Sequence, residues 1–123
     1  MKTHRLLIVD DSVNLALLYK QELEDAEYYV NITNSFTKAI DLHNEKHYDL
    51  IIVETMLEDI KEYDTWQTKI NNNGKIPFII NTTSAHLVNE IPLLSVNADA
   101  CIMKSFDVTV LKEKVDFLLS DSS

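Results

Sequence analysis

Residues 6–11 read Leu-Leu-Ile-Val-Asp-Asp, and residues 50–54 read Leu-Ile-Ile-Val-Glu. Short, continuous apolar runs of this kind are typical of parallel strands that are buried on both faces. Asp10, Asp11 and Glu54 would then follow the carboxyl ends of two strands, at the edge of an open α/β sheet where ligands bind. Three carboxylates that converge there form a hard-oxygen pocket suited to a divalent cation.

The rest of the chain alternates strand-like apolar runs with amphipathic helical patterns. We expect strands over residues 5–9, 29–33, 50–53, 77–80 (continuing to 83) and 100–103, and helices over 13–24, 36–46, 58–70, 87–96 and 108–119. Ser35 and Asp107 are expected to cap the second and fifth helices, and Ser12 or Asp11 the first. Five β–α units with right-handed crossovers predict an α/β fold with a doubly wound, five-stranded parallel sheet. The flavodoxin-like strand order 2-1-3-4-5, with helices on both faces, suits a chain of this length.

Composition narrows the class of protein. At 123 residues, the chain is expected to form one domain over residues 1–123. Eleven basic and 20 acidic residues give a formal charge of −9, which argues against direct binding to nucleic acid or to a membrane. The apolar runs are also far shorter than the roughly 20 residues of a membrane span. Cys101 is the sole cysteine, so an internal disulfide is impossible and a cytoplasmic location is expected.

Glycine is almost absent from the sequence. Gly74 is the only one, whereas ten asparagines are present. Backbone positions with φ > 0 should therefore fall largely to asparagine, which tolerates this region better than most residues. A glycine-rich phosphate loop cannot be built here, which excludes nucleotide binding through such a loop.

Four motifs follow one another along the chain. They are Leu-Ile-Val-Asp-Asp-Ser at 7–12, Tyr-Asp-Leu-Ile-Ile-Val-Glu at 48–54, Ile-Pro-Phe-Ile-Ile at 76–80 and Asn-Ala-Asp-Ala-Cys-Ile-Met-Lys-Ser-Phe at 97–106. Together they resemble the receiver domain of bacterial two-component response regulators, and the resemblance covers essentially the whole chain. It places the family's metal-binding acidic pair at Asp10 and Asp11 and its lysine at Lys104. It places Glu54 where the family has its phosphoacceptor aspartate, and Thr82 at the position of the switch hydroxyl.

The resemblance also implies a chemistry. In the family, Mg²⁺ is held by the acidic pair, the acceptor carboxylate and a backbone carbonyl two residues further on, here Met56. The cation neutralises an incoming phosphoryl group so that the aspartate can attack it. The lysine and the threonine then bind the phosphoryl oxygens. This binding rearranges the face that would be formed here by residues 87–96, 100–103 and 108–119.

The sequence departs from the family's pattern at five places. Glu54 reaches about one bond further than aspartate, which disturbs an in-line geometry that tolerates little displacement. The loop 55–62 lacks the family's Met-Pro and Asp-Gly pairs. Ser105 replaces a proline that the family holds cis, and a cis bond before serine would cost about 3 kcal/mol, so a trans bond is expected. Cys101 takes the place of the rotating aromatic residue, and Asn97 the place of a glycine.

Glu54 has three readings. It could accept a phosphoryl group, it could pair with Lys104 in a built-in mimic of the activated state, or it could have drifted in a domain kept for its interaction surface. Thr82 could likewise be a switch residue or an ordinary hydroxyl at a strand end. The charge pair has a physical rationale, because Lys104 faces three carboxylates that would otherwise repel one another.

We therefore expect a signalling module of the pseudo-receiver type, which is not an enzyme and is not phosphorylated. Its metal site would be a weak Mg²⁺ site formed by Asp10, Asp11, Glu54 and the Met56 carbonyl, and no other cofactor is expected. It would act through protein contacts with a histidine kinase or an output protein, or as a homodimer through the face at 87–96, 100–103 and 108–119. The alternatives are a competent Mg²⁺-dependent phosphoacceptor and a structural dimerisation module of a larger protein.

Other conspicuous side chains have structural explanations. Cys101 is expected to be a buried strand residue that behaves as a small hydrophobe. Trp66 and Tyr63 are expected to pack, although an exposed pair would indicate a docking face. The histidines lack the spacing of metal ligands or of a catalytic triad; they are His4, His43, His47 and His86.

Overall fold

The computed structural model describes residues 4–10, 12–54, 60–71, 76–83, 98–105 and 107–120. The elements in chain order are β1 (His4–Val9), α1 (Val13–Asp25), β2 (Tyr28–Thr33), α2 (Phe36–Lys46), β3 (Leu50–Val53), α3 (Ile60–Ile70), β4 (Phe78–Thr82), β5 (Ala100–Met103) and α5 (Thr109–Leu119). The helix predicted at 87–96 lies outside the described residues.

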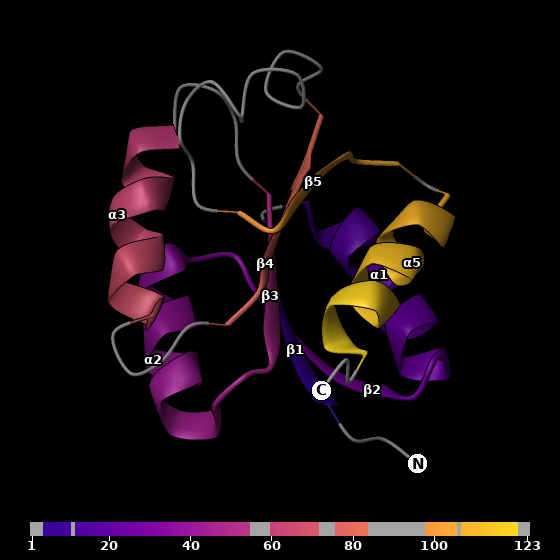
Figure 1. The fold of residues 1–123 in the computed structure, drawn as a ribbon, viewed down its shortest axis with the longest axis horizontal. Coiled ribbons are helices and arrows are strands. Elements are labelled where there is room, and N and C mark those ends of the chain that lie inside the picture. Colours follow the sequence, from indigo (N-terminus) through magenta and orange to yellow (C-terminus); the bar gives the residue numbers. More distant parts are fainter. Residues whose placement is uncertain are drawn as a thin grey trace.

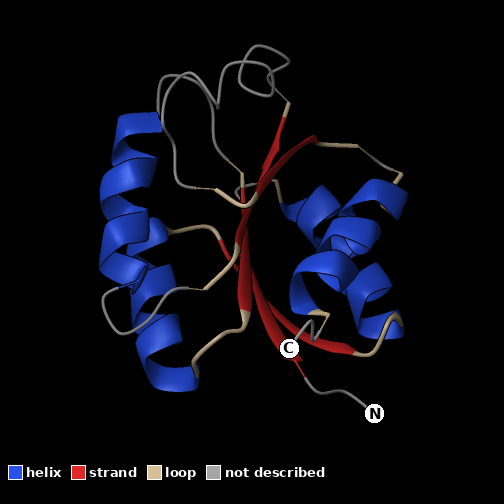
Figure 2. Cartoon of the chain, viewed as in Figure 1, coloured by secondary structure: helices blue, strands red, loops and turns tan. Residues whose placement is uncertain are grey.

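The five strands form one parallel sheet in the order β2-β1-β3-β4-β5. Helices α1 and α5 cover one face of this sheet, and α2 and α3 cover the other (Figure 1; Figure 2). The predicted fold class and strand order are therefore confirmed. None of the helices in the described part of the chain has the length and apolarity needed to cross a membrane.

Each face of the sheet has its own apolar core, because successive side chains of a strand point to opposite faces. Leu6 and Ile8 of β1 belong to the cluster under α1 and α5, whereas Leu7 and Val9 belong to the cluster under α2 and α3. All four residues are almost completely buried. This two-sided burial explains why β1 reads as an unbroken apolar run.

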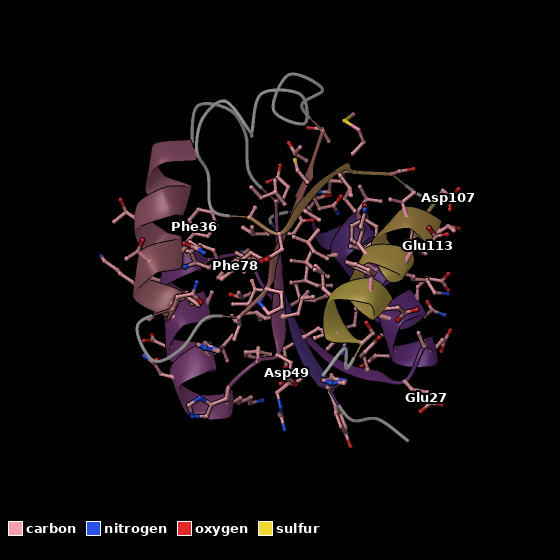
Figure 3. The ribbon with its side chains drawn as sticks, viewed as in Figure 1. Glu27, Phe36, Asp49, Phe78, Asp107 and Glu113 are labelled. Atoms are coloured by element: carbon pink, nitrogen blue, oxygen red, sulfur yellow. The ribbon has the colours of Figure 1, made fainter. Side chains whose placement is uncertain are left out.

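Trp66 of α3 lies inside the second core. Its ring packs 4.9 Å from that of Phe36 and 5.6 Å from that of Phe78, and Nε1 donates a 2.8 Å hydrogen bond to the Phe36 carbonyl. Phe36 and Phe78 point into the layer between the helices and the sheet (Figure 3). The prediction that Trp66 packs is confirmed, because only 5% of its surface is exposed. The side chain of Tyr63 lies outside the described residues.

The predicted element ends agree with the structure to within two residues, and the caps agree in part. Ser35 Oγ accepts a 3.1 Å bond from the Lys38 N–H, as a cap should. The residue before α5 is Val108 and not the predicted Asp107. Asp107 still accepts a 3.0 Å bond from the N–H of Thr109, which lowers the pKa of the Asp107 carboxyl. Ser12 is the residue before α1, but its side chain makes no capping bond.

The prediction for positive φ is wrong in the described part of the chain. The non-glycine residues with positive φ there are Glu27 (73°) and His47 (57°), and neither is an asparagine. His47 ends α2 in the left-handed conformation, with its N–H donating to the His43 carbonyl at 2.8 Å. The end of the helix requires this left-handed backbone, and histidine adopts it at a steric cost. Gly74 and Asn97 lie outside the described residues.

Candidate functional site

The predicted site residues that the structure describes meet at the carboxyl edge of the sheet, which is its upper end in Figure 1. Val9 of β1 pairs with Val53 of β3, so Asp10 and Glu54 follow two paired residues. Their backbone N–H groups continue the ladder, because that of Asp10 donates to the Thr33 carbonyl and that of Glu54 to the Val9 carbonyl, each at 2.9 Å. The backbone thus fixes where both carboxylates start.

Lys104 is positioned by the last two strands. Thr82 of β4 pairs with Met103 of β5, and the N–H of Lys104 donates a 2.7 Å bond to the Thr82 carbonyl. Thr82 itself is fully buried. Four adjacent strands therefore bring Asp10, Glu54, Thr82 and Lys104 to one edge, as the order 2-1-3-4-5 predicts.

The centre of the site is a buried ion pair between Lys104 and Asp10. The Lys104 Nζ lies 2.8 Å from Oδ1 and 2.8 Å from Oδ2 of Asp10. Both side chains are nearly inaccessible to solvent, at 3% and 2%. Asp10 Oδ1 also accepts a 2.8 Å bond from the Ser12 N–H. Removing one partner of such a buried pair leaves an uncompensated charge, which typically costs about 3–5 kcal/mol.

The partner of Lys104 differs from the one predicted. One reading of the sequence paired Lys104 with Glu54, whereas the ammonium binds both oxygens of Asp10. Glu54 is half-buried at the end of β3, the strand next to the one that Asp10 follows. Asp10 and Glu54 start from neighbouring strand ends, so the side-chain geometry decides between them and the sequence pattern could not.

Two departures from the family's pattern are visible beside the pair. The described peptide bonds are all trans, including Lys104–Ser105, as predicted. Cys101 is partly buried against the core of the α2 and α3 face, and its burial raises the pKa of the thiol to about 11. A thiol of this kind is an inert apolar side chain, which agrees with the prediction.

Tyr19 is a residue of the site that the sequence did not suggest. It lies on α1 with 1% of its surface exposed. Its hydroxyl donates to the Ser105 carbonyl at 2.9 Å and accepts from the Ser105 N–H at 3.2 Å. The only sequence signal for this contact is that residue 105 is not proline, which would have no N–H.

The donor set can be compared with what Mg²⁺ requires. Asp11 and Met56, two of the four predicted ligands, lie outside the described residues. Within the described residues, no group of three or more His, Cys, Asp or Glu side chains is placed to hold a metal ion. Mg²⁺ demands octahedral oxygen ligands, and both oxygens of Asp10 are already bound by an ammonium. The described part of the site does not fit tight Mg²⁺ binding, because a cation at Asp10 would first have to displace Lys104.

Comparison with known proteins identifies the relatives of the chain. Residues 6–116 match the family model described as response regulator receiver domain. The response regulator ArlR of Staphylococcus epidermidis is 32% identical over 114 residues, which are 93% of this chain and 52% of that protein. ArlR of Staphylococcus aureus is 30% identical over 115 residues, covering 94% and 52%. The chain thus spans about half the length of these curated relatives.

Solved structures of response regulators have the same fold as this chain. The response regulator TrrA of Thermotoga maritima, solved in complex with Mg²⁺–BeF, superimposes with a TM-score of 0.74 at 28% identity, covering 95% of this chain and all of that one. A two-component response regulator from Clostridium difficile gives a TM-score of 0.81 at 23% identity, covering 97% and 98%, and supports the fold alone.

Proposed function

Because the chain belongs to the response regulator receiver domain family of non-catalytic modules of two-component signalling, we propose that it is a pseudo-receiver. Residues 1–123 form one receiver domain that is not phosphorylated and that signals through protein contacts. The observation that carries the proposal is the buried pair between Lys104 and Asp10, next to a glutamate at the acceptor position.

The acceptor position supports the proposal on geometric grounds. In-line attack on phosphorus requires near-attack placement, and a misplacement of about 1 Å can cost about 100-fold in rate. Glu54 carries one methylene more than the aspartate of the family, so its carboxylate does not stand where the acceptor should. The Glu54 carboxylate still places a negative charge at this edge of the sheet. The site thereby has part of the electrostatics of a phosphorylated aspartate without any phosphoryl transfer.

The charge arrangement supports the proposal independently. A competent receiver needs Asp10 for the metal and Lys104 for the phosphoryl oxygens. Here each is bound to the other, and both are removed from solvent. Mg²⁺ binding by Asp10, Asp11, Glu54 and the Met56 carbonyl is consequently weak, and Thr82, buried at the end of β4, keeps the switch position without a phosphoryl group to bind.

The interaction surface is the side of the domain formed by β5 and α5; residues 87–96, which the resemblance adds to it, lie outside the described residues. Val110 and Phe117 of α5 are 51% and 74% exposed, and Met103 at the end of β5 is 47% exposed. Val110 and Phe117 are seven residues apart, so they lie on one stripe of the helix. Large exposed apolar side chains on one stripe are typical of a contact surface. The partner is a histidine kinase, an output protein or a second copy of this chain.

Two other functions have specific support. TrrA, at 28% identity, was solved with Mg²⁺–BeF, and this likeness favours a competent Mg²⁺-dependent phosphoacceptor as the second candidate. The third candidate is a structural dimerisation module of a larger protein; only its larger-protein part has support, because the curated relatives are about twice as long as the matched region.

Incubation with acetyl phosphate and Mg²⁺, followed by intact mass spectrometry, tests the proposal. We expect no phosphoryl adduct on the wild-type chain. A stoichiometric adduct that disappears in Glu54→Gln would establish the competent receiver instead. The variant Glu54→Asp shortens the acceptor by one methylene: if it is labelled, the block lies in Glu54, and if it is not, the neighbouring loop has lost the chemistry too.

A further inference from the structure

We propose that Tyr19 is a positioning residue, whose hydroxyl holds the segment Lys104–Ser105 on the path that places the Lys104 ammonium on Asp10. The inference rests on the proposed function only in taking this ion pair as the resting state of the site. It assigns a role to a residue of α1 that lies 86 residues from its partner in the chain.

The contact is reciprocal. A phenolic hydroxyl has one hydrogen to donate and lone pairs to accept with. Tyr19 uses both on the same residue, because it donates to the Ser105 carbonyl at 2.9 Å and accepts from the Ser105 N–H at 3.2 Å. Two bonds from one hydroxyl to the N–H and the carbonyl of one residue restrict how that residue can rotate.

The contact uses only the backbone of Ser105. Its side chain is engaged elsewhere, since Oγ accepts a 3.0 Å bond from the Asp107 N–H. Any residue except proline would present the same N–H to Tyr19. The contact therefore requires both a residue other than proline at position 105 and a hydroxyl at position 19 of α1.

The segment that carries Lys104 is held from both sides. On one side, the Lys104 N–H donates to the Thr82 carbonyl at 2.7 Å. On the other, Ser105 is held by Tyr19. A lysine side chain has four rotatable bonds, and burying its ammonium in one position costs conformational entropy. A fixed backbone at residues 104 and 105 lowers this cost, because it aims the side chain at Asp10.

The space beside the hydroxyl is small. Tyr19 and Ser105 line a cavity of about 10 Å³ together with Asn81 and Leu111. A cavity of this size has room for at most about one water molecule. One water molecule could take the place of the hydroxyl, but it would not be tethered to α1, so the segment would gain freedom in Tyr19→Phe.

The structure offers a matched control in Tyr48. This tyrosine is also buried, at 2% exposure, and its hydroxyl donates a 2.8 Å bond to Asn31 Oδ1. Tyr48→Phe thus removes a hydroxyl of similar burial that has no contact with residues 104 or 105. A second matched pair is Ser105→Ala, which keeps the backbone N–H, and Ser105→Pro, which removes it.

The test uses NMR of the full chain without Mg²⁺ or phosphodonor, following the Lys104 side-chain ammonium signal and hydrogen exchange of the Ser105 amide. In Tyr19→Phe we expect that amide to exchange at least about 10-fold faster and the ammonium signal to be lost to exchange with water. Ser105→Pro should also lose the ammonium signal, whereas Tyr48→Phe and Ser105→Ala should keep it.

An ammonium signal that persists in Ser105→Pro or in Tyr19→Phe as it does in the controls would overturn the proposal. If Tyr19→Phe does not fold, the two Ser105 variants decide the question. Because no phosphodonor is present, this result is independent of the acetyl phosphate experiment: an adduct on Glu54 would overturn the proposed function and leave the role of Tyr19 in place.

Discussion

The Lys104 ammonium lies 2.8 Å from both carboxylate oxygens of Asp10, although 94 residues separate the two in the chain. The pair joins β1 to the end of β5 across the carboxyl edge of the sheet. It combines the residue that the family uses for its metal with the residue that the family uses for the phosphoryl group. Each of these two charges is thereby neutralised by the other.

The stability of the domain should depend on pH through His43. The pKa of this imidazole is lowered mainly by burial, with a smaller contribution from His47, while Asp49 acts in the opposite direction. The neutral ring accepts the Tyr48 N–H at Nδ1, at 3.0 Å. Above the unfolded-state pKa of about 6.5 both states are neutral and stability is complete. As the pH falls below that value, the unfolded state binds the proton first and stability is lost.

The measurement is urea unfolding at pH 7.5 and pH 5.5 for the wild type and for His43→Asn, which keeps an acceptor without titrating. The wild type should lose more free energy of unfolding on acidification than the variant, by at most about 1.4 kcal/mol per pH unit. An equal loss in both proteins would show that His43 does not carry the effect.

His47 should be a site where glycine stabilises the fold relative to alanine. Its φ of 57° ends α2 in the left-handed region, where a Cβ costs roughly 1–2 kcal/mol. We expect His47→Gly to exceed His47→Ala in free energy of unfolding by about 1 kcal/mol, measured with denaturant. Equal stability of the two variants would mean that the backbone there is not restrained.

Self-association should depend on Phe117. This side chain is 74% exposed on α5, so Phe117→Ser should change the free energy of unfolding by less than about 0.5 kcal/mol. If the surface of β5 and α5 is the contact between copies, sedimentation velocity should show a weaker dimer for Phe117→Ser. Leu17→Ser, which changes a 52% exposed residue of α1, is the control. Equal weakening by both variants would place the contact elsewhere.

The fold could be predicted almost completely, and the site in part, for different physical reasons. Strands such as Leu50–Val53 are buried on both faces, so composition alone marks them. The edge at which Asp10, Glu54 and Lys104 meet follows from strand order. Which carboxylate binds the ammonium depends on side-chain geometry and could not be predicted. The contact between Tyr19 and Ser105 leaves no periodic signal, because it joins one hydroxyl to a backbone far along the chain.

The central claim is that the Lys104 ammonium takes the place of a divalent cation at Asp10. It is tested most directly by titrating Mg²⁺ into the wild type and into Lys104→Met, following the amide signals of Asp10 and Glu54. The account predicts no saturable binding to the wild type at concentrations that saturate the variant, and at least about 10-fold tighter binding to Lys104→Met, because three carboxylates without an ammonium favour the cation. Saturation of both proteins at the same Mg²⁺ concentration would contradict it.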